Sequence, residues 1–244
     1  EFGDREKADA AFAKAHHVTR IAYVNNKLVS NYMEPRAAIG DDSLGVTYET
    51  AAAKFIWFAT DAPFEGLTFL HTHADGLTDD VPGVFAAHAY PIGGGLSTFI
   101  VETDEDTWRA AGLDGFDLTT APGPSDEHSQ RRLEEIFAPL IGGARLIGNN
   151  SRWGNFRTIR ARSWHSGKVV LLGDAVHTAH FSVGSGTKMS LEDAIALADA
   201  LATHPDDVEA AFLAYEAERQ PQVARIQGAA RPSLSWWENF GTYF

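Results

Sequence analysis

Late in the chain, a strand, a loop and a helix bring together residue types that bind phosphate- and sugar-bearing ligands. Lys168–Leu172 predicts a buried strand that ends in Gly173-Asp174, and an aspartate at the carboxyl end of such a strand lies where α/β sheets bind ligands. Its carboxylate can accept hydrogen bonds from sugar hydroxyls. Gly184 and Gly186 let the backbone approach a ligand closely, and the helix after them points free N–H groups at an anion. Spacing alone leaves a second interpretation open, in which Gly173-Asp174 is only a turn into a helix.

The chain is acidic overall, but its charge is unevenly spread. The formal net charge of −13 argues against a general nucleic-acid binder, whose footprint would be basic. Between Glu135 and Asp174, however, no acidic residue occurs, and the basic residues of that stretch are Arg145, Arg152, Arg157, Arg160, Arg162 and Lys168. One interpretation is a solvated basic face. The other is a local positive field suited to a phosphate-bearing cofactor or substrate, with Arg157 and Arg160 as candidate substrate contacts.

A predicted antiparallel sheet carries a second group of candidate side chains. Short turns separate its expected strands, Phe55–Ala59, Leu67–His71, Val84–Tyr90 and Leu96–Glu102. His88 and Tyr90 are two residues apart on one strand and therefore share a face. Ordinary packing around a satisfied histidine is one interpretation. The other is a substrate wall in which Trp57 and Tyr90 contact a ring and His88 supplies a hydrogen-bonding group.

Helices complete a mixed architecture. They are expected over Asp104–Ala111, over Asp126–Phe137 with Pro139 closing it, from about Thr187 to Ala202, and from about Asp207 towards Gln220, with Pro221 disturbing its continuation. A helix at Asp4–Ala15 and strands at Arg20–Val24 and Lys27–Ser30 are predicted before the sheet. The aromatic residues Trp236, Trp237, Phe240, Tyr243 and Phe244 have helical spacing, which favours packing. The fold class is α+β, with a strand–loop–helix unit like part of an α/β nucleotide-binding domain.

Several classes of site are not predicted. The chain has no cysteine, which excludes disulfides, thiolate metal sites and a Cys nucleophile. His71-x-His73 and His177-x-x-His180 lack a matching carboxylate constellation, so no metal site is expected. Ser185 lies in a Gly-Ser-Gly too short for a hydrolase nucleophile elbow. No apolar run is long enough to span a bilayer and no secretory signal opens the chain, so we expect a cytoplasmic enzyme without a membrane partner.

The late segment resembles the second FAD-binding motif of the flavoprotein aromatic hydroxylases. That motif has Gly-Asp-Ala-x-His after a strand, then a glycine-containing loop, then a helix with Glu-Asp-Ala. The matching parts are Gly173–His177, Phe181–Thr187 and Glu192–Ala194. The resemblance implies that Gly173-Asp174 meets FAD, with Asp174 holding the ribityl chain. It also implies that the loop lies against the isoalloxazine ring and pyrophosphate, through Gly184, Ser185, Gly186 and Thr187.

Other segments are similar to one branch of these enzymes, the hydroxylases of aryl-CoA thioesters such as anthraniloyl-CoA or salicylyl-CoA. A related hydroxylase of violacein biosynthesis shares much of the same sequence. The segments are Phe55-Ile56-Trp57, Ala87–Tyr90, Ser97–Thr103, Trp153-x-Asn155-Phe156 and His180–Gly184. The resemblance covers roughly Lys54 to Tyr243. It implies a substrate domain at 54–144 and the later part of an FAD-binding domain at 145–244, after a poorly matched segment at 1–53.

The resemblance implies an NAD(P)H-dependent monooxygenase. NAD(P)H reduces FAD, and O₂ supplies the oxygen atom that is added to an electron-rich aromatic ring, with a small aromatic substrate and an aryl-CoA thioester favoured. Because the cofactor carries this chemistry, the protein needs no strong acid–base pair. A phenol or aniline substrate benefits from a nearby base, and His88 and His180 are the candidates.

Two features depart from the family pattern. Its members begin with a strand and a Gly-x-Gly-x-x-Gly turn that binds the ADP half of FAD, and this sequence has no such motif. A middle Asp-Gly motif should precede Phe55, and only Gly40–Ser43 is near. We therefore expect a chain that lacks the N-terminal dinucleotide-binding unit, as a fragment or through a missing or altered N-terminal region. The alternative function is a non-catalytic, flavoprotein-like binding module that does not retain FAD.

Overall fold

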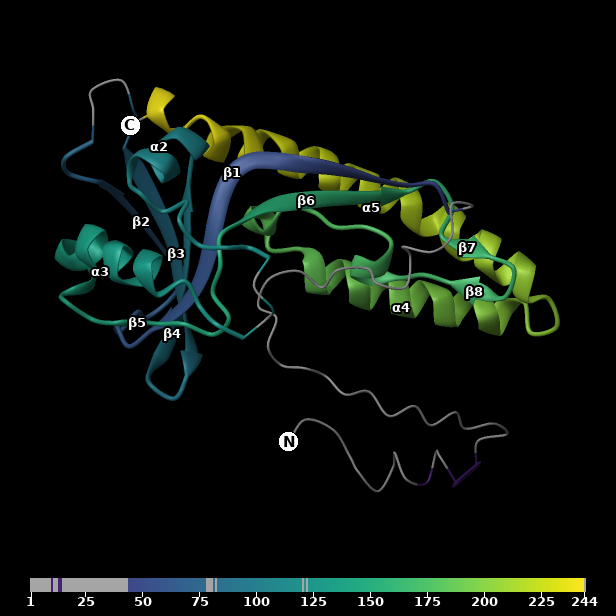
Figure 1. Cartoon of the computed structure of the whole chain (residues 1–244). Helices are drawn as coiled ribbons and strands as arrows, with labels where there is room; N and C mark the ends of the chain where they lie inside the picture. The colour runs from purple at the N-terminus through teal and green to yellow at the C-terminus, as the bar shows by residue number, and fades with distance from the viewer. Residues whose placement is uncertain are drawn as a thin grey trace.

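The computed structural model describes residues 44–77, 83–119 and 123–243, together with Ala10, Ala13, Lys14, Val81 and Ala121. The helix predicted at 4–15 and the strands predicted at 20–24 and 27–30 therefore lie almost wholly outside the described residues. The described chain forms two neighbouring halves, one built on a sheet and one on two long helices (Figure 1). Each half has its own hydrophobic core.

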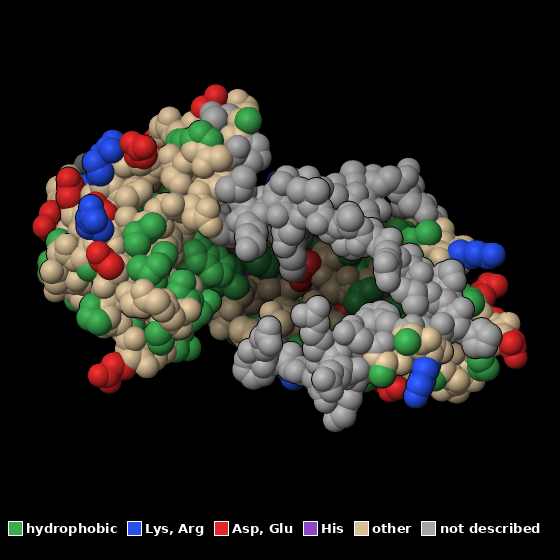
Figure 2. Space-filling view, turned by 90° about the horizontal axis from the view of Figure 1, so that it is seen from below, with side chains coloured by type: hydrophobic (Ala, Val, Ile, Leu, Met, Phe, Trp, Pro, Cys, Tyr) green, Lys and Arg blue, Asp and Glu red, His purple; other side chains and the backbone are tan. Residues whose placement is uncertain are grey.

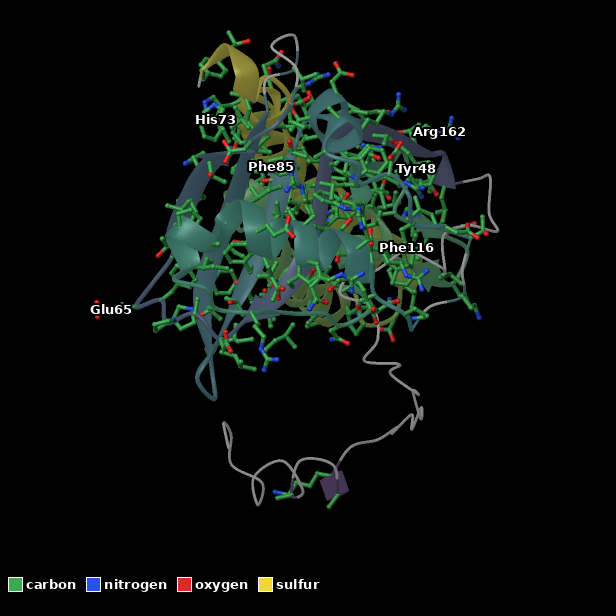
Figure 3. All side chains as sticks on the ribbon, turned by 60° about the vertical axis from the view of Figure 1, so that its left-hand side comes forward. Tyr48, Glu65, His73, Phe85, Phe116 and Arg162 are labelled. Atoms are coloured by element: carbon green, nitrogen blue, oxygen red, sulfur yellow. The ribbon has the colours of Figure 1, made fainter. Side chains whose placement is uncertain are left out.

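One antiparallel sheet forms the first half, and its strands follow the order β2–β3–β4–β1–β5, with β6 pairing with β1. The bounds are β1 Val46–Thr60, β2 Thr68–His73, β3 Val84–Gly93, β4 Leu96–Thr103, β5 Leu146–Ile147 and β6 Gly154–Ala161. The predicted antiparallel strands are confirmed. The early part of β1 and all of β6 were missed, and residues 46–50 stay largely exposed, so no buried apolar run marks the start of β1. In Figure 3, Tyr48 and Arg162 mark the end of the sheet where β1 begins and β6 ends, well away from Phe85 in β3.

Helices α2 (Glu105–Ala110) and α3 (Glu127–Ile141) pack on the sheet half. Their predicted starts are confirmed, since Asp104 and Asp126 accept hydrogen bonds from backbone N–H groups of the first turn. The predicted closure by Pro139 is wrong. A proline near the helix end removes only one N–H donor, and the helix ends instead at Gly142, whose φ is 61°.

The second half contains α4 (Gly186–Thr203) and α5 (Val208–Glu238), which lie side by side (Figure 1). The prediction of α4 is confirmed, but the expected disturbance at Pro221 is wrong, because α5 continues through Pro221 and Pro232. Both prolines are on the exposed side of the helix, where the lost N–H bond does not disturb packing. The buried side recurs every fourth residue, at Ala211, Tyr215, Arg219, Val223 and Gln227. No helix among the described residues combines the length and apolar content needed to cross a bilayer.

The remaining elements are short: the hairpin β7 (His165–Ser166) and β8 (Val169–Val170), and the 3₁₀ turns η2 (Gly173–Ala175), η3 (Phe181–Val183) and η4 (Phe240–Thr242). The predicted buried strand over Lys168–Leu172 is wrong. Only β8 forms there, its partner within the described ranges is β7 alone, and Val169 is 61% exposed. An apolar run buries both faces only between neighbouring strands, and the described part of the chain provides none beside β8 other than β7.

Candidate functional site

One face of the sheet carries the predicted substrate-wall residues in adjacent rows. Directly opposite residues of antiparallel strands point to the same side of the sheet. Trp57, Ile100 and His88 are opposite one another across β1, β4 and β3, and Thr98 and Tyr90 belong to the next row. The structure therefore brings Trp57, His88 and Tyr90 to one face. His88 is buried, whereas Trp57 and Tyr90 are partly exposed.

The loop that follows Asp174 packs against this face. The ring centroid of Phe181, in η3, lies 5.3 Å from that of Phe55 and 5.8 Å from that of His88. The ring of Phe156, in β6, also lies 5.8 Å from that of Phe181. The predicted glycine loop, Phe181–Thr187, and the predicted substrate wall are thus in direct contact, although the sequence separates them widely.

The turn at Gly173-Asp174 presents a carboxylate that has no hydrogen-bond or ion-pair partner among the described residues. Gly173 has φ 61°, and a Cβ built on it would lie 2.7 Å from the Ser190 Oγ of α4, so only glycine fits without a shift. Burial raises the pKa of the Asp174 carboxyl, although the charge of His177 lowers it. No side chain or backbone group of the described residues hydrogen-bonds or ion-pairs with the Asp174 carboxylate. Its oxygens are therefore available to the hydroxyls of a ligand.

A buried network holds this turn on α4. Asp193 is fully buried, and its Oδ2 accepts hydrogen bonds from the Gly173 N–H at 2.9 Å and from His177 Nε2 at 2.7 Å. Its Oδ1 accepts from Arg219 Nε at 2.8 Å. Burial alone would raise the pKa of Asp193, but the hydrogen bonds from His177 and Arg219 outweigh burial and hold it below its ordinary value. Asp193 therefore positions the turn rather than meeting a ligand.

The start of α4 is open to an anion. Ser185 is the N-cap but makes no side-chain hydrogen bond to the helix, and no acidic residue lies in the first turn. A Cβ built on Gly184 or Gly186 would meet no atom of the described structure within 4 Å. The first-turn N–H groups, including that of Thr187, can therefore face a phosphate at close range.

The candidate arginines do not form one patch. Arg157 and Arg160 are three apart on β6, so their side chains leave opposite faces of the strand. Arg160 Nη1 lies 2.9 Å from Glu49 Oε2, and its Nε donates to Gln227 Oε1 at 3.0 Å. Arg157 is exposed. A role for either in substrate binding stays a prediction, and one ligand on a single face of β6 would not meet both.

The sequence predicted both candidate bases but not the carboxylate between them. Glu102 Oε2 lies 3.0 Å from His88 Nε2, and Glu102 Oε1 lies 3.5 Å from His180 Nε2. All three side chains are at most 7% exposed. The available signal was a single acidic residue in the otherwise apolar and hydroxyl-bearing strand β4. Arg219 was missed too, and its signal was a charge in the buried i, i+4 stripe of α5.

Hollows border these elements. Figure 2 shows the surface hollowed between the two halves, with apolar side chains on the floor of the hollow. A cavity of about 160 Å³ lies between β6, α5 and the turn after Asp174, and Trp164, His177 and Gln227 line it. Ligand pockets usually enclose roughly 300–1,000 Å³, so this cavity is too small for a CoA thioester.

Comparison with known proteins places this geometry in a family. A family model described as "FAD binding domain" matches residues 86–230, a stretch that includes His88, the Asp174 turn and the glycine loop. The chain belongs to this FAD-binding family. This match confirms the resemblance to the flavoprotein hydroxylases that the motif at 173–194 indicated.

Curated relatives cover most of the chain. It is 60% identical over 202 residues to a salicyloyl-CoA 5-hydroxylase of Streptomyces sp, a match that covers 83% of this chain and 38% of that protein. It is 41% identical over 195 residues to the 3-hydroxy-4-methyl-anthranilyl-[aryl-carrier protein] 5-monooxygenase of Streptosporangium sibiricum, covering 80% and 48%. It is 32% identical over 213 residues to the protodeoxyviolaceinate monooxygenase of Chromobacterium violaceum, covering 86% and 53%. The chain therefore spans about half or less of the length of these relatives.

Solved structures agree on the fold. Pseudomonas aeruginosa PqsL, a probable FAD-dependent monooxygenase, superposes with a TM-score of 0.53 at 22% identity over 79% of this chain and 50% of that one. Klebsiella pneumoniae HpxO, solved with FAD and uric acid, gives 0.56 at 19% identity over 80% and 48%. Both matches support a mixed α/β fold of the flavoprotein monooxygenase type.

Proposed function

We propose that this chain supplies the ribityl-binding turn and the substrate wall of an FAD-dependent aromatic-ring hydroxylase. The observation that carries the proposal is the packing of Phe181, in the glycine loop, against Phe55 and His88 on the sheet. A hydroxylase must hold the aromatic ring beside the cofactor, and this contact joins the two motifs. The 60% identity to a salicyloyl-CoA 5-hydroxylase supports an aryl-CoA thioester as the substrate.

The residues present fit FAD at two points. The Asp174 carboxylate, which no described residue pairs with, suits ribityl hydroxyls. The start of α4, beside Gly184 and Gly186 and without a side-chain cap, suits a phosphate or the edge of the ring. When bound and reduced by NAD(P)H, FAD supplies the activation of O₂ and the oxygen transfer. In this proposal residues 145–244 form the later part of a Rossmann-like FAD domain and residues 54–144 the substrate domain.

The chain's own side chains position the substrate and move a proton. Trp57 and Tyr90 flank the aromatic ring, and the surrounding apolar residues exclude water. His88 or His180 acts as the base that takes a proton from a phenol or aniline and so raises the electron density of the ring. The partner of the site is a small aromatic molecule carried on CoA.

The basic residues of β6 test the CoA part of the proposal. Arg157→Ala or Arg160→Ala should raise the KM for salicyloyl-CoA more than the KM for free salicylate, because only the CoA ester carries phosphates. The KM for the ester should also rise with ionic strength. Arg131→Ala, an exposed arginine on α3, is the matched control. The measurement is substrate-dependent NADH oxidation together with product mass.

Two outcomes would contradict the proposal in different ways. Equal effects of the β6 variants on both substrates, or a KM indifferent to salt, would remove the CoA argument and favour a small phenol or indole. Purified protein that holds no flavin and forms no product would support the alternative of a non-catalytic binding module.

A further inference from the structure

Glu102 is the polar link between the substrate wall and the glycine loop. It projects from β4, is 1% exposed, and reaches His88 on β3 and His180 at the start of η3. No lysine or arginine of the described residues pairs with it. Its surroundings are otherwise aromatic, since Phe181 and Trp237 contact the histidine rings. A carboxylate in such a setting costs free energy unless a partner offsets its desolvation.

The hydrogen bonds of His180 fix which nitrogen faces Glu102. The Ser182 N–H donates to His180 Nδ1 at 3.4 Å, and the Ser182 hydroxyl lies 2.8 Å from the same nitrogen. The Ser233 hydroxyl of α5 in turn donates to the Ser182 hydroxyl at 2.8 Å. Since Nδ1 accepts, the proton of the neutral ring is on Nε2, which points at Glu102 Oε1. The chain of contacts runs from the sheet through the loop to α5.

The contact with His88 is close but not aligned. His88 Nε2 and Glu102 Oε2 lie 3.0 Å apart, yet neither atom has a hydrogen-bond partner among the described residues. Both atoms are buried, and a buried polar atom without a hydrogen-bond partner costs free energy. His71 is in the same row of the sheet as Glu102, and burial, followed by the charge of His88, lowers its pKa. His71 therefore does not supply the balancing charge near neutral pH.

A metal does not explain the group. Among the described residues no set of three or more His, Asp and Glu side chains is arranged to hold a metal ion, and this includes His88, Glu102 and His180. The distances instead place the Glu102 carboxylate between His88 of β3 and His180 at the start of η3.

We propose that Glu102 is a positioning residue that seats the glycine loop on the substrate wall. Its carboxylate holds His180, and through it η3 and the first turn of α4, at a fixed distance from His88. The proposal rests on the proposed function, because the seated loop is the one that would face FAD. It assigns no contact between Glu102 and the cofactor or substrate.

Two substitutions separate positioning from plain structural support. Glu102→Leu removes a buried carboxylate that no lysine or arginine of the described residues pairs with, so its desolvation cost disappears, whereas the loop loses its hold. FAD affinity should then fall at least about tenfold, because the loop is no longer held in the position that would face FAD. Glu102→Gln should retain the wild-type affinity, because the amide oxygen and nitrogen can take the places of the two carboxylate oxygens beside His180 and His88. Glu216→Gln, in the separate His165–Glu216 pair at 2.8 Å, is the matched control.

The experiment combines flavin titration with hydrogen–deuterium exchange of the full chain without FAD. Faster exchange confined to residues 180–190 in Glu102→Leu, with wild-type rates in Glu102→Gln and Glu216→Gln, is the expected result. Unchanged exchange in Glu102→Leu, or a parallel loss of global stability and flavin binding, would overturn the positioning role. If wild-type protein binds no FAD while Glu102→Leu still exchanges faster than wild type at residues 180–190, the proposed function is overturned. The positioning role of Glu102 then stands.

Discussion

At the residue scale, the Asp193 carboxylate holds three neighbouring groups in place. It receives hydrogen bonds from the backbone of Gly173, from His177 and from Arg219, and it is fully buried. Asp193→Asn keeps the shape but removes the buried carboxylate that pairs with Arg219, so the partly exposed Glu192 is its remaining carboxylate partner. We expect a loss of about 3–5 kcal/mol in the free energy of unfolding, measured by urea denaturation. Asp199→Asn, on the exposed side of α4, should change it by less than about 0.5 kcal/mol.

The same residue makes stability depend on pH. The pKa of Asp193 is held below its ordinary value, so its contribution is present at neutral pH and is lost as pH falls through that lowered pKa. The wild type should therefore lose stability in acid more steeply than Asp193→Asn does. Urea midpoints measured from pH 7 down to about pH 3 report the difference, and parallel curves for the two proteins would contradict it.

At the scale of elements, the proposed position of the glycine loop beside the flavin can be tested at the start of α4. Gly186 opens the helix in a conformation that any residue can adopt, and a Cβ built on it would have no described atom within 4 Å. Gly186→Val should therefore leave the circular dichroism spectrum intact and abolish FAD occupancy, because the added side chain enters the ligand's space. Gly228→Val, an exposed helical glycine of α5 with the same open surroundings, should retain FAD. Normal FAD binding by Gly186→Val would place the loop away from the flavin.

Elements with a local sequence pattern could be predicted, whereas features that depend on tertiary contacts could not. β2, β3, β4 and the helix starts follow from apolar patterns and capping aspartates, both of which are local. The length of α5 does not, because Pro221 predicts a disturbance that the structure does not show. Its buried stripe also includes Arg219 and Gln227, whose partners, Asp193 and the β6 backbone, are known only from the structure. Similarly, His88 and Tyr90 could be paired by strand period, whereas Glu102 between two histidines is a product of tertiary packing.

At the scale of the whole molecule, α5 joins the two halves. Its first turns pack beside α4 and its end packs on the sheet, where Trp237 is 2% exposed and its ring lies 4.5 Å from His88 and 4.7 Å from Phe240. Trp237→Ala should cost about 3–5 kcal/mol of the free energy of unfolding through the cavity that it leaves. Tyr243→Ala, at a site 60% exposed, should change the free energy of unfolding little. Similar losses for both variants would contradict the role of Trp237 in joining the two halves.

We propose that this chain holds the ribityl side of FAD at Asp174, facing the sheet. Titration of purified wild type, Asp174→Ala and Asp199→Ala with FAD, followed by flavin fluorescence, tests it most directly. We predict that wild type and Asp199→Ala bind alike, and that Asp174→Ala binds more weakly by about 1.5–3 kcal/mol, or roughly tenfold to a hundredfold in Kd. Equal affinity of Asp174→Ala and wild type would contradict the claim.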